Sequence, residues 1–265
     1  MNKISYLILD FMRPDESKVC LESIYKHTKC PFQVIYLSNG GVQDYVYEYY
    51  KNGLIHKLLL NKENNGLGFG TTDLFKYCNT KHAIYLQSDQ TLRRTLASYE
   101  IDFLISFLDI PKDDKIIKSI SLAGDQCQGK YSERAHLIDV NFYNSIPDKP
   151  NGGAGPYHDI EWNEGYIQRY YEKNNYLHYI YETLFIDNGC YATRQNPDGS
   201  VWTHRTDTKQ LKLIRGPINN KFVYPQFSDE EWNNVFKTQS WPDWKVPDRE
   251  RVNSFVFFKP EEQNV

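Results

Sequence analysis

The sequence lacks the features that mark several large classes of protein. Its 265 residues contain no apolar run approaching the roughly 20 residues of a membrane-spanning helix. Met1 leads almost directly into a strand-like pattern, which leaves no room for a signal peptide. The net charge is −3, so we expect no basic surface for nucleic acid. The five cysteines form no C-x-x-C pair, which indicates free thiols in a reducing compartment and argues against a thiolate metal site. These absences predict a cytoplasmic protein without an integral membrane segment.

What the sequence does contain is a series of short apolar runs that are typical of buried strands, at residues 4–10, 32–41 and 82–90. Each run becomes polar or glycine-rich at its C-terminal end, and a helix-like segment or a loop follows. This alternation predicts an α/β fold with a mostly parallel central sheet flanked by helices. Ligands bind such sheets beyond the carboxyl ends of the strands, so polar residues at those ends are candidates for a site.

Hydrophobic periodicity predicts further elements. We expect helices after Arg13 and near residues 42–53, 71–78 and 163–173, and another from Ser228; we expect strands at 54–60, 115–124, 136–143 and 177–186, with loops at 61–70 and 147–156. The second half of the chain is less regular than the first. Without a repeat or a linker, the chain is predicted to form one domain over residues 1–265.

Four short motifs occur in order in the first 95 residues. They are Asp10-Phe11-Met12-Arg13-Pro14 followed by Cys20-Leu21-Glu22-Ser23-Ile24, then Ser38-Asn39-Gly40-Gly41, then the loop from Asn64 to Gly70, and finally Gln87-Ser88-Asp89. In this order and spacing they resemble the inverting, family-2-like glycosyltransferases of the GT-A fold, which are Rossmann-like. The resemblance covers roughly residues 1–95 well and the rest loosely. The glycine spacing Gly66-x-Gly68-x-Gly70 does not match the dinucleotide-binding G-x-G-x-x-G.

The resemblance implies a nucleotide-sugar donor and an acceptor that is a glycan or another hydroxyl compound. It divides the domain into a nucleotide-sugar half (1–95), an acceptor and catalytic half (96–227) and a C-terminal helix and tail (228–265). It also implies a set of donor-binding residues: Asp10, Phe11, Arg13, Ser38, Asn39, Asn65, Gly66, Gly68, Gln87 and Ser88. Serine at position 38 replaces an aspartate of the family, and it cannot form the stronger charge-assisted hydrogen bond.

The resemblance also implies Mn²⁺ or Mg²⁺ as a cofactor. The family's Asp-x-Asp is matched by Gln87-Ser88-Asp89, so Asp89 would supply the carboxylate. A hard cation takes oxygen ligands, and the loss of one acid predicts a lower metal affinity. Asp187, from the alignment of strand ends, and His204 are the candidates for a further ligand. The alternative interpretation is that Asp89 caps a helix beginning near Thr91.

Inversion requires a general base at the acceptor hydroxyl. When the sequences are aligned on Arg169, the family's Glu-Asp pair falls on Trp162-Asn163, and the nearby acids are Glu164, Glu161 and Asp159, in our order of preference. Acids in the first turn of a helix also stabilise it through its dipole, without any chemical role.

The sequence therefore predicts an inverting, metal-assisted glycosyltransferase that uses a nucleotide-diphosphate sugar, with a UDP-sugar as first choice. Two alternatives remain open. The missing acid and Ser38 fit a catalytically inactive protein of the same fold that binds a sugar or a nucleotide. A sugar-nucleotide-forming nucleotidyltransferase fits less well, because Asp10-Phe11-Met12-Arg13 lacks the glycines that its loop needs.

Overall fold

The computed structural model describes most of the first 187 residues and several short strands beyond them. The described residues are 3–11, 13–39, 43–61, 66–123, 130–150 and 163–187, with the strand segments 192–195, 201–204, 216–218, 221–223 and 256–258. After Phe185 the description covers the backbone alone.

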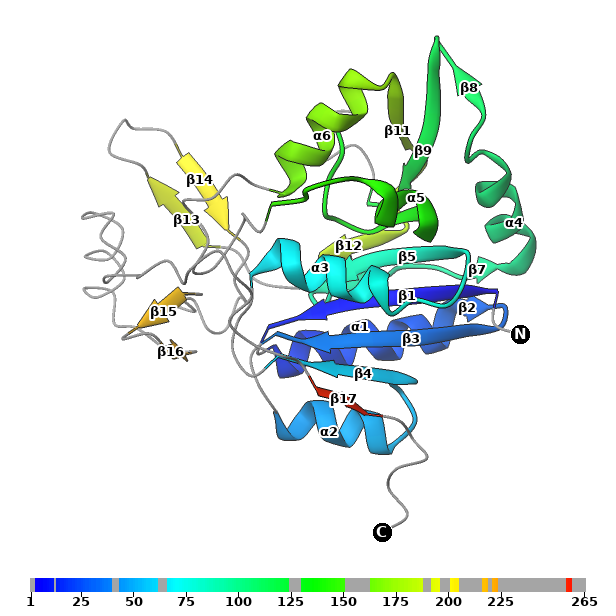
Figure 1. Cartoon of the computed structure of the whole chain (residues 1–265). Helices are drawn as coiled ribbons and strands as arrows, with labels where there is room; N and C mark the ends of the chain where they lie inside the picture. Colours follow the sequence, from blue (N-terminus) through cyan, green and yellow to red (C-terminus); the bar gives the residue numbers. More distant parts are fainter. Residues whose placement is uncertain are drawn as a thin grey trace.

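A large, mostly parallel sheet runs through the molecule (Figure 1). Its strand order is β11 (Tyr176–Ile180), β9 (Lys115–Ser121), β10 (His136–Asp139), β5 (His82–Gln87), β1 (Ile4–Asp10), β3 (Phe32–Ser38), β4 (Lys57–Leu60) and β17 (Val256–Phe258), with β8 (Pro111–Lys112) paired to β9. β5, β1, β3 and β4 are parallel, as are β9 and β11, whereas β10, β17 and β8 run antiparallel to their neighbours. The predicted α/β fold with a mostly parallel sheet is confirmed.

Helices cover both faces of the sheet. One face carries α1 (Pro14–His27), α2 (Asp44–Lys51) and α4 (Ser98–Ser106), and the other carries α3 (Leu67–Lys76), α5 (Val140–Ser145) and α6 (Asn163–Lys173). Smaller strand pairs lie outside the sheet: β2 (Thr28–Lys29) with β7 (Leu96–Ala97), β6 (Gln90–Leu92) with β12 (Phe185–Asp187), β13 (Ala192–Gln195) with β14 (Val201–His204), and β15 (Gly216–Ile218) with β16 (Lys221–Val223).

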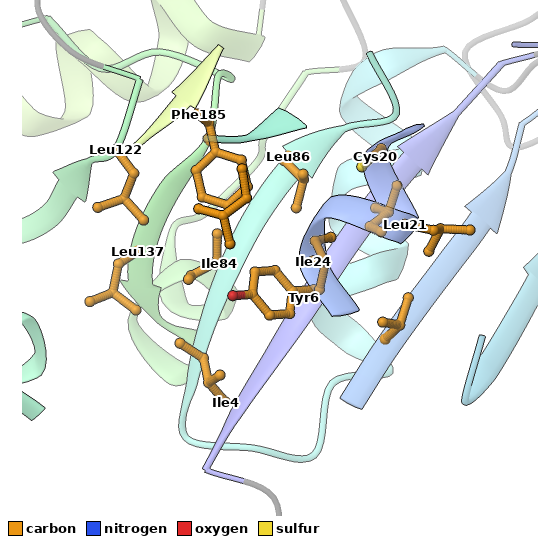
Figure 2. Close-up of a cluster of buried hydrophobic side chains, with 14 of the residues drawn as sticks. Ile4, Tyr6, Cys20, Leu21, Ile24, Ile84, Leu86, Leu122, Leu137 and Phe185 are labelled. Atoms are coloured by element: carbon orange, nitrogen blue, oxygen red, sulfur yellow. The ribbon is translucent and has the colours of Figure 1, made fainter. Parts of the chain in front are cut away.

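The strand alternation separates the core into two layers. Ile4, Tyr6 and Ile8 of β1 pack in the layer under α1, while Leu7 and Leu9 belong to the layer under α3. Figure 2 shows the first layer, in which side chains of α1 lie over the central strands. Since full burial of one such aliphatic side chain stabilises a protein by roughly 1.5–3 kcal/mol, these layers hold the strand ends in place.

Helix α3 begins four residues earlier than predicted. Gly68 and Gly70 were expected in a loop, but they are buried inside this helix, which starts after Gly66. A Cβ at Gly70 would lie 2.8 Å from Leu9 Cδ1, so glycine allows α3 to pack closely on β1. The glycines at positions 68 and 70 thus serve a helix rather than a loop.

Two of the apolar runs predicted as strands leave the large sheet part-way along their length. The run at 136–143 leaves the sheet after Asp139, whose side chain accepts a hydrogen bond from the backbone N–H of Phe142 and caps α5. The run at 177–186 is divided between β11 in the large sheet and β12, which pairs with β6. Apolar runs do not show where a strand exchanges one partner for another, and this accounts for both errors.

No helix among the described residues is long and apolar enough to span a membrane. The helix predicted from Ser228, the loop at residues 151–156 and the chain end lie outside the described residues.

Two buried histidines predict how stability depends on pH. His136 donates from Nδ1 to the carbonyl of Arg134 (2.7 Å), and His178 Nδ1 lies 2.6 Å from Ser119 Oγ. Burial lowers the pKa of His136 to about 4 and also lowers that of His178. Unfolded histidines bind protons below about pH 6.5 and the folded ones do not, so stability should fall as pH drops below this value. The loss at His136 is on the order of 3 kcal/mol by pH 4.

Urea unfolding measures the slope of the free energy of unfolding against pH. Between pH 5 and pH 7 this slope is measured above the range in which most carboxyl groups titrate. In His136→Gln the slope should decrease markedly, whereas His27→Gln, at a partly exposed position whose pKa is lowered chiefly by desolvation, should change it less. An equal slope in wild type and His136→Gln would contradict the prediction.

Candidate functional site

Several of the predicted site residues meet at one edge of the sheet, where parallel strands end. Asp10 at the end of β1 is opposite Ser38 at the end of β3, and Leu9 is opposite Gln87 at the end of β5. Motifs that are far apart in the sequence therefore lie side by side at this edge.

Asp10 organises this edge. Its Oδ1 accepts hydrogen bonds from Ser17 Oγ (2.9 Å) and Ser88 Oγ (2.7 Å), and its Oδ2 accepts one from Tyr45 Oη (2.6 Å). The carboxylate therefore joins the first turn of α1, the residue after β5 and helix α2 to the end of β1. Asp10 is fully buried, so a ligand could reach its carboxylate only by displacing one of these hydroxyls.

A second set of contacts supports these hydroxyls. Tyr36 on β3 donates to Ser17 Oγ (2.8 Å), and the backbone N–H of Arg13 donates to Tyr45 Oη (3.1 Å). Periodicity explains Tyr45 as an apolar residue of α2, and it provides no signal for the hydroxyl contact. Sequence analysis therefore missed Ser17 and Tyr45 as parts of the site.

Arg13 and Asp89 form an ion pair at the same edge. Their side chains are only 12% and 15% exposed, so the pair is much less screened than a surface pair. The alternative interpretation of Asp89 as a helix cap is wrong, because Gln90–Leu92 forms strand β6. Asp89 thus lies in the turn between β5 and β6, with a guanidinium against its carboxylate.

Two buried asparagines continue the edge beyond Ser38. Asn61, directly after β4, donates to Asn39 Oδ1 (2.7 Å), and Asn39 donates to the carbonyl of Gly66 (3.0 Å). Gly66 has φ of 82°, which favours glycine, and it precedes the N-terminus of α3. The chain of amides thereby fixes the start of α3; a polar residue directly after a buried strand was the signal that could have identified Asn61.

The other predicted donor-binding residues differ in exposure. Ser38 is fully buried and Ser88 is bonded to Asp10, whereas Phe11 and Gln87 are partly exposed. Asn65 lies outside the described residues.

Of the three candidate bases, the structure describes Glu164, in the first turn of α6. Burial raises the pKa of its carboxyl, while a hydrogen bond from Ser132 and the charge of Arg134 oppose this rise. Glu161 and Asp159 lie outside the described residues.

Sequence analysis missed a second acid beside Glu164. Glu133 Oε1 accepts a hydrogen bond from Asn163 Nδ2 (2.6 Å), and burial raises the pKa of Glu133 to about 8, with the charge of Glu164 adding to the effect. Glu133 precedes β10, which runs antiparallel to β5. The start of β10 therefore lies at the same edge as the end of β5, and a strand assigned the right direction could have indicated this acid.

The remaining metal candidates are described only through their backbones. The register of β12 on β6 places Asp187 opposite Gln90, next to Asp89, and the register of β14 on β13 places His204 opposite Ala192. Among the described residues, no group of three or more His, Cys, Asp or Glu side chains is arranged to hold a metal ion. A hard cation that also binds phosphate takes oxygen ligands, and carboxylates such as that of Asp89 are of this kind.

No family model matches this chain, and no curated protein matches it. Solved structures do. The mannosyltransferase PcManGT from Pyrobaculum calidifontis, in complex with GDP-Man and Mn²⁺, is 8% identical with a TM-score of 0.50, over 69% of this chain and 56% of that chain. The chain has the fold of GT-A glycosyltransferases. It spans little more than half the length of that neighbour, and at this identity the match shows the fold alone.

Two further structures match less closely. TarS 1–349 of S. aureus in complex with UDP is 14% identical with a TM-score of 0.46, over 69% of this chain and 58% of that one. The apo-form glycosyltransferase GlyE of Streptococcus pneumoniae TIGR4 is 10% identical with a TM-score of 0.40, over 66% of this chain and 44% of that one.

The hydrogen bonds of Asp10 predict a large loss of stability when its carboxylate is removed. Asp10→Ala leaves two buried hydroxyls and the partly buried hydroxyl of Tyr45 without their acceptor, so the free energy of unfolding should fall by about 3 kcal/mol or more. Tyr45→Phe should cost about 1–2 kcal/mol, and Asp15→Ala, which removes an exposed acid from the first turn of α1, less than about 1 kcal/mol. Chemical unfolding measures all three, and an Asp10→Ala loss no larger than that of Asp15→Ala would show that the contacts contribute little.

Proposed function

We propose that this chain transfers a sugar from a nucleotide-diphosphate donor to an acceptor hydroxyl with inversion of configuration. The observation that carries the proposal is the single edge of a GT-A-type sheet at which Arg13, Asp89 and the N-terminus of α3 are joined through Asp10 and Asn39. A UDP-sugar is the first candidate donor. A GDP-sugar is the second, because the mannosyltransferase of similar fold was solved with GDP-Man.

The donor diphosphate would bind beside Arg13. A guanidinium recognises phosphate oxygens through several N–H groups, and the N-terminus of a helix such as α3 favours an anion. Phe11, partly exposed at the end of β1, would pack against the nucleobase. Ser38 is buried, so it would support the residues that contact the nucleotide and would not bond the nucleotide directly.

Asp89 would hold Mn²⁺ or Mg²⁺, with Asp187 next to it and Gln87 or His204 as further ligands. When bound, the cation would offset the negative charge that develops on the leaving nucleotide diphosphate. The carboxylate of Asp89 forms an ion pair with Arg13, so the cation would compete with this guanidinium for the carboxylate.

Glu164 would act as the general base that takes the proton of the acceptor hydroxyl. It stands in the first turn of α6, and its partial burial raises its pKa and makes the carboxylate a stronger base. Glu161 and Asp159 remain alternative bases in this proposal.

A catalytically inactive binding protein is the second candidate function. The observation in its favour is the Arg13–Asp89 ion pair, which satisfies the one acid of the Gln87-Ser88-Asp89 motif without any metal. Such a protein would bind a nucleotide or a sugar without transferring it.

Thermal unfolding with a panel of nucleotides and nucleotide sugars, each with Mn²⁺ or with EDTA, tests the donor site. A ligand present at about 100 times its Kd stabilises the folded state by about 2.7 kcal/mol, which gives a measurable rise in Tm. We expect a rise with one UDP- or GDP-sugar that is lost in EDTA. A rise that persists in EDTA would contradict the metal role of Asp89, and no rise with any of them would contradict the donor site.

Replacing Glu164 by Gln separates the enzyme from the inactive binder. The proposal predicts a loss of sugar transfer by at least about 100-fold with unchanged donor-induced stabilisation, since a general base contributes roughly that much or more. Glu22→Gln, at an exposed position of α1, is the matched control and should retain full activity. Transfer that is unaffected by Glu164→Gln would exclude Glu164 as the base.

A further inference from the structure

Three consecutive residues before β10 are bonded to the first two turns of α6. Gln168 Oε1 accepts from the backbone N–H of Tyr131 (2.6 Å), Ser132 hydrogen-bonds the carboxylate of Glu164, and Asn163 Nδ2 donates to Glu133 Oε1 (2.6 Å). The segment 131–133 thus holds the start of the helix that carries the proposed base.

Glu133 occupies an unusual position for an acid. It is 3% exposed, its Oε2 has no hydrogen-bond partner among the described residues, and no ion pair joins it to a described Lys or Arg. A buried carboxylate without a cation is costly, whereas the neutral acid is far less so.

The groups that face Glu133 come from several elements, and few of them favour a negative charge. Glu164 of α6 adds a negative charge, and Tyr85, Tyr131 and Tyr143 from β5, from the segment before β10 and from α5 are neutral, because burial raises the pKa of each phenol. Arg134, next in the chain, exerts its charge on Glu164.

We propose that Glu133 is a positioning residue of the acid–base site: as a neutral carboxylic acid it anchors Asn163 and leaves Glu164 as the ionised carboxylate of the pair. The inference rests on the proposed function for what Glu164 does, and on the structure for how the two acids are coupled. Glu164 is only partly buried and is supported by Ser132 and Arg134, so it loses its proton first. The negative charge of Glu164 then favours the protonated form of Glu133.

The consequence is a loss of activity at alkaline pH. As pH rises through the pKa of Glu133, about 8, a second negative charge forms beside Glu164 in a buried site. The bond to Asn163 and the placement of Glu164 should then change, so kcat/KM should fall above about pH 8.

The enzymatic test is the pH profile of kcat/KM for wild type, Glu133→Gln and Glu133→Ala. Glutamine stays neutral and can still accept from Asn163, so we expect a decrease of less than tenfold at pH 7 and an alkaline limb moved up by at least one pH unit. Glu133→Ala loses the bond to Asn163 and should lose more than tenfold at every pH. An unmoved alkaline limb in Glu133→Gln would overturn the proposal.

A second measurement needs no turnover. The infrared carbonyl band of a protonated carboxylic acid should be present in wild type at pH 7, disappear with a midpoint near pH 8, and be absent in Glu133→Gln. In Glu164→Gln the midpoint should move down, because the neighbouring charge is gone. The inference would be overturned if the band were absent at pH 7, or if its midpoint were the same in Glu164→Gln as in wild type. Wild type without transfer activity contradicts the proposed function instead, and the infrared midpoints still decide whether the two acids are coupled.

Discussion

The carboxylate of Asp10 is the interaction on which the arrangement of this edge depends. Hydroxyls from α1, from α2 and from the residue after β5 converge on it in a place that is fully buried. Hydrogen bonds to an ionised acceptor are shorter and stronger than neutral ones, and a buried carboxylate needs several of them. If one element moved, the others would lose part of this common acceptor. The position of Arg13 at the start of α1 and of Asp89 after Ser88 follows from this constraint.

The central strands and most helices could be predicted from the sequence, because their apolar pattern depends on local burial. The strand at 4–10 and the helix at 163–173 lie at the expected residues, and the strand expected at 82–90 ends at Gln87. The errors arise where tertiary contacts decide. Gly70 looks like a loop residue until Leu9 is placed against it, and Asp139 ends a strand by capping a helix that periodicity does not distinguish from a longer strand. The C-terminal strand β17 joins the sheet beside β4, a long-range pairing that no local pattern predicts.

The candidate site shows the same division. Residues at the ends of parallel strands were predictable, since the end of one strand is level with the end of the next. The acids near α6 could be predicted only in part. The position expected to carry an acid is Asn163, whose amide instead bonds Glu133 from a segment about thirty residues earlier in the chain. The two acids near the start of this helix therefore come from different elements, and spacing along the sequence cannot reveal such an exchange.

The Arg13–Asp89 pair sets the charge balance of the proposed donor site. Separating a nearly buried pair leaves one charge uncompensated, which costs more than the pair itself contributes. A cation that bound Asp89 alone would leave the guanidinium of Arg13 without an opposite charge. A diphosphate that bound Arg13 alone would leave the carboxylate of Asp89 without one. When both arrive, each side chain exchanges one opposite charge for another. In the proposed function the two ligands therefore favour each other's binding, and this coupling must be reciprocal. In that proposal, one acid with an arginine beside it would bind a cation together with the diphosphate, whereas an acid pair would bind the cation by itself.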